Sequence, residues 1–192
     1  MALKSNKKSS MDNYQVEKSK IIYGTSRLHH KFFKKQRYSI LKKALELGFF
    51  HFDTSPYYGN GIAERELGIL IKKNPNKKIL ISTKFGINSK LNFGNNILLV
   101  IFIKVIEKIF PYFRKPLFDY SIKAAEKSLN RSLTHMNISK IDFFFIHEPK
   151  KKIKDVDKLI QWLQKQKNDK KIGTWGFAGS KKYFIKWIDQ TN

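Results

Sequence analysis

Apolar and polar positions along this chain follow two periods, one typical of strands and the other typical of helices. Short apolar runs predict strands at residues 20–24, 49–53, 79–83, 141–146 and 172–177. Apolar positions three and four apart predict a helix before Gly48, helices at 64–73 and 119–133, and two more beginning at Asp155 and Ser180. This fivefold alternation of strand and helix predicts an α/β fold with a parallel sheet.

Single residues mark where the predicted helices begin and end. Gly48 follows the first helix in the position where a left-handed residue usually ends one. The Asn74-Pro75 pair ends the second helix, because proline cannot continue the hydrogen-bond ladder. Asp119 and Asp155 precede the later helices and are expected to cap their free N–H groups.

Four residues that can transfer or stabilise a proton lie at or just beyond the ends of three predicted strands. They are Asp53 and Tyr58 in FDTSPYYG, Lys84 in ISTKFG, and His147 in FFFIHEP. The carboxyl ends of the strands of a parallel barrel converge on one mouth, so these side chains are expected to share a pocket.

The chemistry of these four types is that of an acid–base site. Strand alternation places His51 and Asp53 on one side of the second strand, and Asp53 is expected to pair with Lys84. The ammonium group is expected to lower the pKa of Tyr58 from about 10. Tyr58 could then give a proton to a carbonyl oxygen or take one from an alcohol, while His147 bonds the same oxygen.

Two segments interrupt the alternation of strand and helix. Residues 1–19 are rich in lysine and are predicted to be a flexible tail, which leaves residues 20–192 as the folded unit. Residues 85–117 form an insertion that contains ILLVIFIKVIEKIF. This run is too short for a membrane span and carries three charged residues. It is predicted to be a helix over the barrel mouth, with an interfacial membrane helix as the alternative.

Composition excludes several classes of function. The chain has 192 residues, 41% of them hydrophobic, which fits one globular domain with a core. It has no cysteine, so disulfides, thiolate catalysis and cysteine-bound metals are excluded. No spacing of histidine and carboxylate residues indicates a metal site. The first residues lack the apolar segment of a secretory signal, so a cytoplasmic location is expected.

The net charge of +24 raises the possibility of binding to nucleic acid or to an anionic membrane. Only 5 of the 39 basic residues are arginines, the type best suited to base edges and phosphates. We therefore interpret the charge as general basicity that gives weak association with anionic surfaces at low salt, without a specific nucleic-acid site.

The motifs FDTSPYYG, ISTKFG, SLNRSL, IDFFFIHEP and KIGTWGF together resemble the aldo-keto reductase family, from Ile21 to Phe177. The resemblance implies a (β/α)8 barrel that reduces small aldehydes and ketones with NADPH or NADH and without a metal. It implies that Tyr58 is the proton donor, that Lys84 and Asp53 tune it, and that His147 orients the substrate. The nicotinamide would supply the hydride.

The resemblance also bears on the cofactor site and on the extent of the barrel. It places Gly24, Thr25 and Ser180 at the cofactor. Ser180 would replace the polar residues of a Gly-Val-Ser-Asn-like run, which reads Gly-Phe-Ala-Gly at 176–179 here. Family barrels have eight strand–helix units and cofactor phosphate anchors near the last two, whereas this sequence predicts five. We therefore expect an incomplete, C-terminally truncated (β/α)8 barrel with an insertion after the third strand.

Alternatives to a carbonyl reductase remain open at this point. One is a non-catalytic fragment, or half of a split barrel that needs a complementing C-terminal half and otherwise aggregates or forms oligomers. Another is an aldolase that forms a Schiff base on Lys84, and a third is a nucleic-acid-binding protein. Each site residue also has a purely structural reading, such as a turn for Asp53 or His147.

Overall fold

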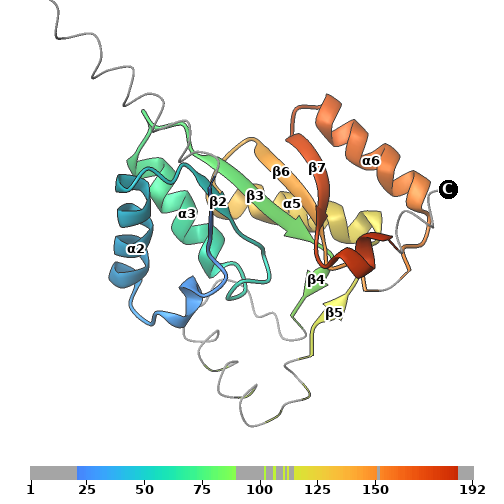
Figure 1. Cartoon of the computed structure of the whole chain (residues 1–192), viewed down its shortest axis with the longest axis horizontal. Helices are drawn as coiled ribbons and strands as arrows, with labels where there is room; N and C mark the ends of the chain where they lie inside the picture. The colour runs from blue at the N-terminus through green and yellow to red at the C-terminus, as the bar shows by residue number, and fades with distance from the viewer. Residues whose placement is uncertain are drawn as a thin grey trace, which may run out of the picture.

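The computed structural model describes residues 21–89, 115–150 and 152–185, together with 102, 106, 110 and 112. Five parallel strands form one sheet in the order β1-β2-β3-β6-β7, with helices between them along the chain (Figure 1). The strands are β1 (Ile22–Gly24), β2 (His51–Asp53), β3 (Leu80–Phe85), β6 (Ile141–His147) and β7 (Ile172–Ala178). The helices are η1 (Leu28–His30), α2 (Lys34–Glu46), α3 (Ile62–Lys73), α5 (Ile122–Met136) and α6 (Val156–Asn168). The predicted α/β fold with parallel strands is confirmed.

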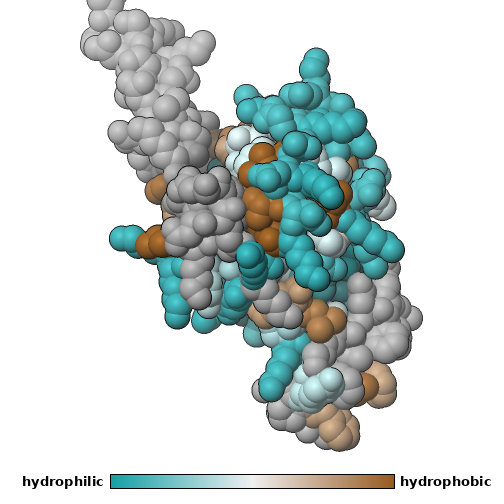
Figure 2. Space-filling view, turned by 90° about the vertical axis from the view of Figure 1, so that its right-hand side faces the viewer, coloured by the Kyte–Doolittle hydropathy of each residue, from teal (hydrophilic) through white to brown (hydrophobic). Residues whose placement is uncertain are grey.

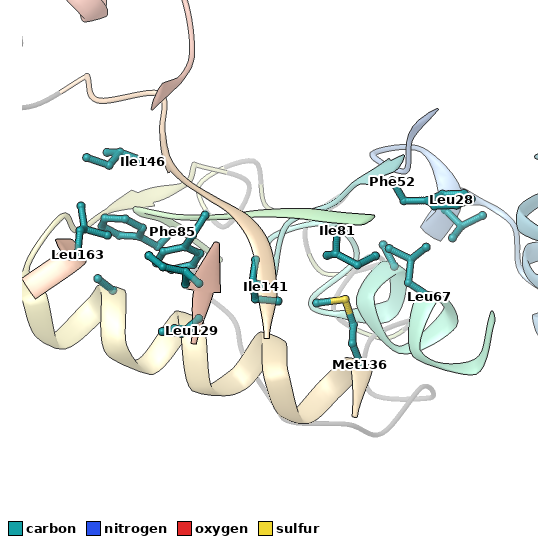
Figure 3. Packing of buried hydrophobic residues seen from close by; sticks show 14 of the residues in the cluster. Leu28, Phe52, Leu67, Ile81, Phe85, Leu129, Met136, Ile141, Ile146 and Leu163 are labelled. Atoms are coloured by element: carbon teal, nitrogen blue, oxygen red, sulfur yellow. The ribbon is translucent and has the colours of Figure 1, made fainter. Parts of the chain in front are cut away.

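The core lies between the sheet and the helices that cover one of its faces (Figure 3). Alternate strand residues point to this face, and the largest of them are fully buried: Phe52, Ile81, Phe85, Phe144 and Ile146. They pack with apolar residues of the helices, among them Leu67, Leu129, Met136 and Leu163. Each such side chain contributes roughly 1.5–3 kcal/mol when it is removed from water. These contacts fix the positions of the strand ends.

The strand residues that alternate with these core residues face the other side of the sheet. In register across four strands, this side carries Asp53, Ser82, Phe143 and Thr174. Phe143 is only partly buried, whereas its neighbour Phe144 is fully buried. The side of β6 that carries Phe143 is therefore less covered than the side that packs against the helices.

Some predicted boundaries are confirmed and others shift. Gly48 has φ 88° and ends α2, and the Asn74 side chain donates to the Leu70 carbonyl at the end of α3. Asp119 is not the cap of α5: the hydroxyl of Ser121 accepts the Ala124 N–H there. Asp155 holds the cap position of α6 but makes no side-chain cap hydrogen bond.

The insertion is closed at its base by two short antiparallel strands, β4 (Ile87–Asn88) and β5 (Leu117–Phe118). The predicted helix over the mouth lies almost wholly outside the described residues, and so does the tail of residues 1–19. Among the described residues, no helix has the length and apolarity needed to cross a membrane. Figure 2 shows the side of the molecule that bears α6, where apolar residues appear in small groups among hydrophilic ones.

We predict that Gly68→Ala destabilises the fold through the contact between α3 and α5. A Cβ atom at Gly68 would lie 2.8 Å from the backbone Cα and carbonyl oxygen of Met136, where no flexible side chain can move aside. The expected loss is about 1–3 kcal/mol in the free energy of unfolding, measured by urea denaturation. The control is Gly24→Ala, because a Cβ there meets nothing within 4 Å. Equal stability of the two variants would contradict the prediction.

Candidate active site

Lys84 and Asp53 form a close ion pair at the ends of β2 and β3. The Lys84 Nζ atom lies 2.6 Å from each carboxylate oxygen of Asp53 and also donates to the Thr54 carbonyl at 2.9 Å. The Lys84 side chain is only 6% exposed, so the protein replaces the water that an ammonium group normally binds. Lys84 lies within β3 and not after the strand as predicted, which fixes the direction of its side chain.

Tyr58 lies in the loop after β2, with its phenol beside this pair. Its hydroxyl is 3.5 Å from the Lys84 Nζ, which lies 5.1 Å from the centre of the ring. The loop is held locally, because the Tyr58 N–H donates to the Ser55 carbonyl and its own carbonyl accepts the Ala63 N–H. The prediction that Asp53, Tyr58 and Lys84 lie together is confirmed by these distances.

His147 completes the cluster as the last residue of β6. Its ring meets the ring of Tyr58 edge to face, with the centroids 6.2 Å apart and the planes at 86°. Its Nδ1 atom is buried and has no hydrogen-bond partner among the described residues. All four predicted residues therefore gather at one end of the sheet.

The expectation that Lys84 lowers the pKa of Tyr58 is wrong for this arrangement. Burial, with the Asp53 carboxylate as the second cause, raises the pKa of Tyr58 to about 12. The Asp53 carboxylate compensates the charge of Lys84, so the phenol sits beside a pair and not beside a free cation. Burial also lowers the pKa of Lys84, and the Asp53 carboxylate opposes that change.

The imidazole of His147 is neutral at ordinary pH. Burial, followed by the charges of Lys84 and Lys150, lowers the pKa of His147 to about 4. The cluster thus holds a phenol that keeps its proton and an uncharged imidazole next to it. Such a pair can present a proton and a hydrogen bond to one oxygen atom of a ligand.

The three residues predicted at the cofactor lie in two places. Gly24 is paired in register with Asp53, and the Thr25 N–H and hydroxyl both donate to the Asp53 carbonyl at 2.9 Å. Ser180 lies two residues beyond β7, where its carbonyl accepts N–H groups of a following helical turn. Within the described part of the chain, no hydrogen bond joins Ser180 to the four clustered residues.

Sequence reasoning missed a set of residues on α5 and just before it that hold the site loops. The Tyr120 hydroxyl contacts the backbone carbonyls of His147 and Glu148. The Ser128 hydroxyl donates to the Lys84 carbonyl at 3.0 Å, and Arg131 donates to Asn60 in the Tyr58 loop at 2.9 and 3.0 Å. The available signal was the SLNRSL motif, which places polar residues beside the buried Leu129.

A buried carboxylate ties α3, β3 and α5 together behind the cluster. Glu64 is fully buried, and its Oε1 accepts the hydroxyls of Thr83 at 2.9 Å and Ser132 at 2.6 Å. Its Oε2 lies 3.0 Å from the Nδ1 of His135. No group of three or more histidine, aspartate or glutamate side chains suited to a metal occurs among residues that the structure describes.

We predict that Asp53→Asn lowers the pKa of Tyr58 below about 12. The change removes the carboxylate that raises this pKa and leaves the nearby Lys84 without its counter-charge. The measurement is an NMR titration of tyrosine Cζ signals, assigned with Tyr58→Phe. Tyr120 is an internal control, because its pKa is also about 12 but does not depend on Asp53. An unchanged or higher pKa of Tyr58 would refute the assignment.

We also predict that His147 makes the fold less stable in acid. A pKa near 4 in the folded chain, against an ordinary 6.5, means that the unfolded chain binds more protons between those values. The stability of the wild type relative to His147→Gln should therefore fall as the pH drops from 6.5 to 4. Urea denaturation at several pH values measures this difference, and curves that stay parallel would show that His147 is not buried as described.

Comparison with known proteins places this geometry in a family. The family model described as the Aldo/keto reductase family matches residues 20–191. L-galactose dehydrogenase of Arabidopsis thaliana is 27% identical over 143 residues, which are 72% of this chain and 37% of that protein.

The similar solved structures include a dehydrogenase and an aldo-keto reductase. A glycerol dehydrogenase from Gluconobacter oxydans has a TM-score of 0.67 and 23% identity, covering 88% of this chain and 47% of that one. An aldo-keto reductase from Klebsiella pneumoniae in complex with NADPH has a TM-score of 0.61 and 16% identity, covering 89% and 49%. This chain thus spans between a third and a half of the length of these relatives.

These likenesses agree with the parallel strand–helix units of the described fold, as expected for part of a (β/α)8 barrel. The family model matches nearly the whole chain, and the chain belongs to the aldo/keto reductase family.

Proposed function

We propose that this chain carries the proton-transfer site of a nicotinamide-dependent carbonyl reductase or alcohol oxidoreductase, with Tyr58 as the proton donor. One observation carries the proposal: the buried Lys84 Nζ lies 2.6 Å from the Asp53 carboxylate and 3.5 Å from the Tyr58 hydroxyl. The Tyr58 phenol, the proposed acid, therefore lies beside a fixed ion pair at the end of the sheet.

The roles of the four residues follow from their protonation states. Tyr58 keeps its proton at neutral pH and can donate it to the carbonyl oxygen of a small aldehyde or ketone. The neutral imidazole of His147 bonds the same oxygen and orients the substrate. Lys84 and Asp53 hold the Tyr58 hydroxyl in place. The alcohol-oxidising direction needs the phenolate, so its rate should rise with pH toward the pKa of Tyr58.

The cofactor of this proposal is NADPH or NADH, which would supply the hydride from its nicotinamide ring. One buried polar atom of the site suits a ligand, because the His147 Nδ1 has no partner among the described residues. Beside Asp53, Gly24 leaves open space where a side chain would stand. Gly24, Thr25 and Ser180 are the residues we assign to the cofactor, and the NADPH complex of the Klebsiella pneumoniae relative supports the cofactor class.

We predict that Tyr58→Phe lowers carbonyl reduction by about 10²–10⁴-fold while leaving NADPH binding unchanged, because only the donated proton is lost. Turnover is measured by NADPH oxidation with a panel of small aldehydes and ketones, and binding is measured by fluorescence with NADPH and NADH. The matched control is Tyr57→Phe, which removes a hydroxyl from the adjacent residue of the same loop.

Two results would contradict the proposal. Turnover retained by Tyr58→Phe would exclude Tyr58 as the acid. A folded wild-type chain that neither binds a nicotinamide cofactor nor reduces any carbonyl would favour the alternative of a non-catalytic chain that keeps the four residues.

A further inference from the structure

A cavity lies beside the Tyr58 loop, along the face of α5. It has a volume of about 300 Å³. Its lining includes Pro56, Asp119, Lys123, Lys127, Ser128 and Arg131. It adjoins the candidate active site at Pro56, two residues before Tyr58, and at Ser128, which bonds the Lys84 carbonyl. A volume of this size is at the lower end of ligand pockets and suits a small molecule or one end of a larger one.

The lining is positively charged along one side of the helix. Lys123, Lys127 and Arg131 follow one another at intervals of four residues, so all three lie on the same face of α5. Asp119 is the one carboxylate among the described residues of the lining. Among the described residues, neither Lys123 nor Lys127 forms an ion pair. Like charges at this spacing destabilise a helix unless something offsets them.

Arg131 gives a second indication that the cavity suits a negatively charged ligand. Its guanidinium is partly buried, and burial lowers its pKa. Its hydrogen bonds go to the neutral oxygens of Asn60, and within the described residues it makes no ion pair. The carboxylate that acts on it, Glu64, has both oxygens occupied by Thr83, Ser132 and His135. Arg131 is therefore partly withdrawn from water, with the Glu64 carboxylate acting on it but with no carboxylate of the described residues in direct contact, and such a guanidinium favours a negatively charged ligand.

We propose that this cavity binds an anionic group, a phosphate or a carboxylate, of a small molecule. Arg131 supplies a planar fork of N–H donors, and Lys123 and Lys127 supply two mobile ammonium groups. Asn88 and Ser89 also line the cavity and have neutral hydrogen-bonding groups. The proposal stands apart from the catalytic one, because it uses none of Asp53, Tyr58, Lys84 and His147.

The test is binding of inorganic phosphate to the whole chain by equilibrium dialysis, at constant ionic strength set with chloride. Lys123→Ala combined with Lys127→Ala should weaken binding by about tenfold or more, since each lost charge-assisted hydrogen bond is worth more than a neutral one. The control combines Lys167→Ala with Lys171→Ala, which removes two exposed lysines at the same spacing outside the cavity. Urea denaturation confirms that both double variants fold like the wild type.

Two further experiments determine which class of anion binds and what the Arg131 guanidinium contributes. Acetate as the competing anion distinguishes a carboxylate site from a phosphate site, and either result supports the proposal. Arg131→Lys keeps the charge but loses the fork, so phosphate should bind several-fold more weakly. Absence of saturable binding in the wild type, or equal weakening in the two double variants, would overturn the proposal and assign the effect to general basicity.

Discussion

The buried ion pair between Lys84 and Asp53 is the constraint on which the site depends. An ammonium group that is 6% exposed needs acceptors at short range, and it has them only when β2, β3 and the start of the Tyr58 loop are all in place. A buried pair of this kind adds little net stability, because desolvation offsets most of the attraction. Its effect is geometric, since it brings the Tyr58 hydroxyl to a fixed place beside two opposite charges. Burial, with the Asp53 carboxylate as the second cause, raises the pKa of Tyr58 and keeps its proton in place at neutral pH.

Helix α5 and the residues just before it act as the frame of this site. Tyr120 holds the turn after His147, Ser128 holds the Lys84 carbonyl, and Arg131 holds Asn60 in the Tyr58 loop. These contacts of Tyr120 and α5 reach two loops and strand β3, and Glu64 links α5 to α3 and β3. The frame is therefore built mostly from hydrogen bonds to backbone groups. Hydrogen bonds to the backbone depend on the path of a loop and not on its side chains, so many loop sequences are compatible with them.

The sequence predicted what depends on local pattern and missed what depends on packing. Strand ends and the gathering of Asp53, Tyr58, Lys84 and His147 follow from alternation and parallel topology, and the structure bears them out. The direction of the Tyr58 pKa shift did not follow, because burial, its largest cause, is a property of the assembled site. The hydrogen bonds from α5 to the site could not be predicted, because a serine or an arginine in a sequence gives no sign of whether it faces solvent or bonds a neighbouring loop. Ser121, and not Asp119, caps α5 because the helix begins at Ile122, and a cap residue must directly precede the first helical residue.

The two faces of β3 show how stability and chemistry are combined in one strand. Ile81 and Phe85 point into the core, while Ser82 and Lys84 point to the opposite side, where Ser82 lies 2.6 Å from His51. Thr83 lies between them in sequence and bonds Glu64 on the helix side. Substitutions at alternate positions should therefore act on different properties, with folding affected on one face and the site on the other. A shift of the β3 register by one residue would exchange the faces and move Lys84 out of reach of Asp53, so the apolar packing of Ile81 and Phe85 is also what places the ammonium group.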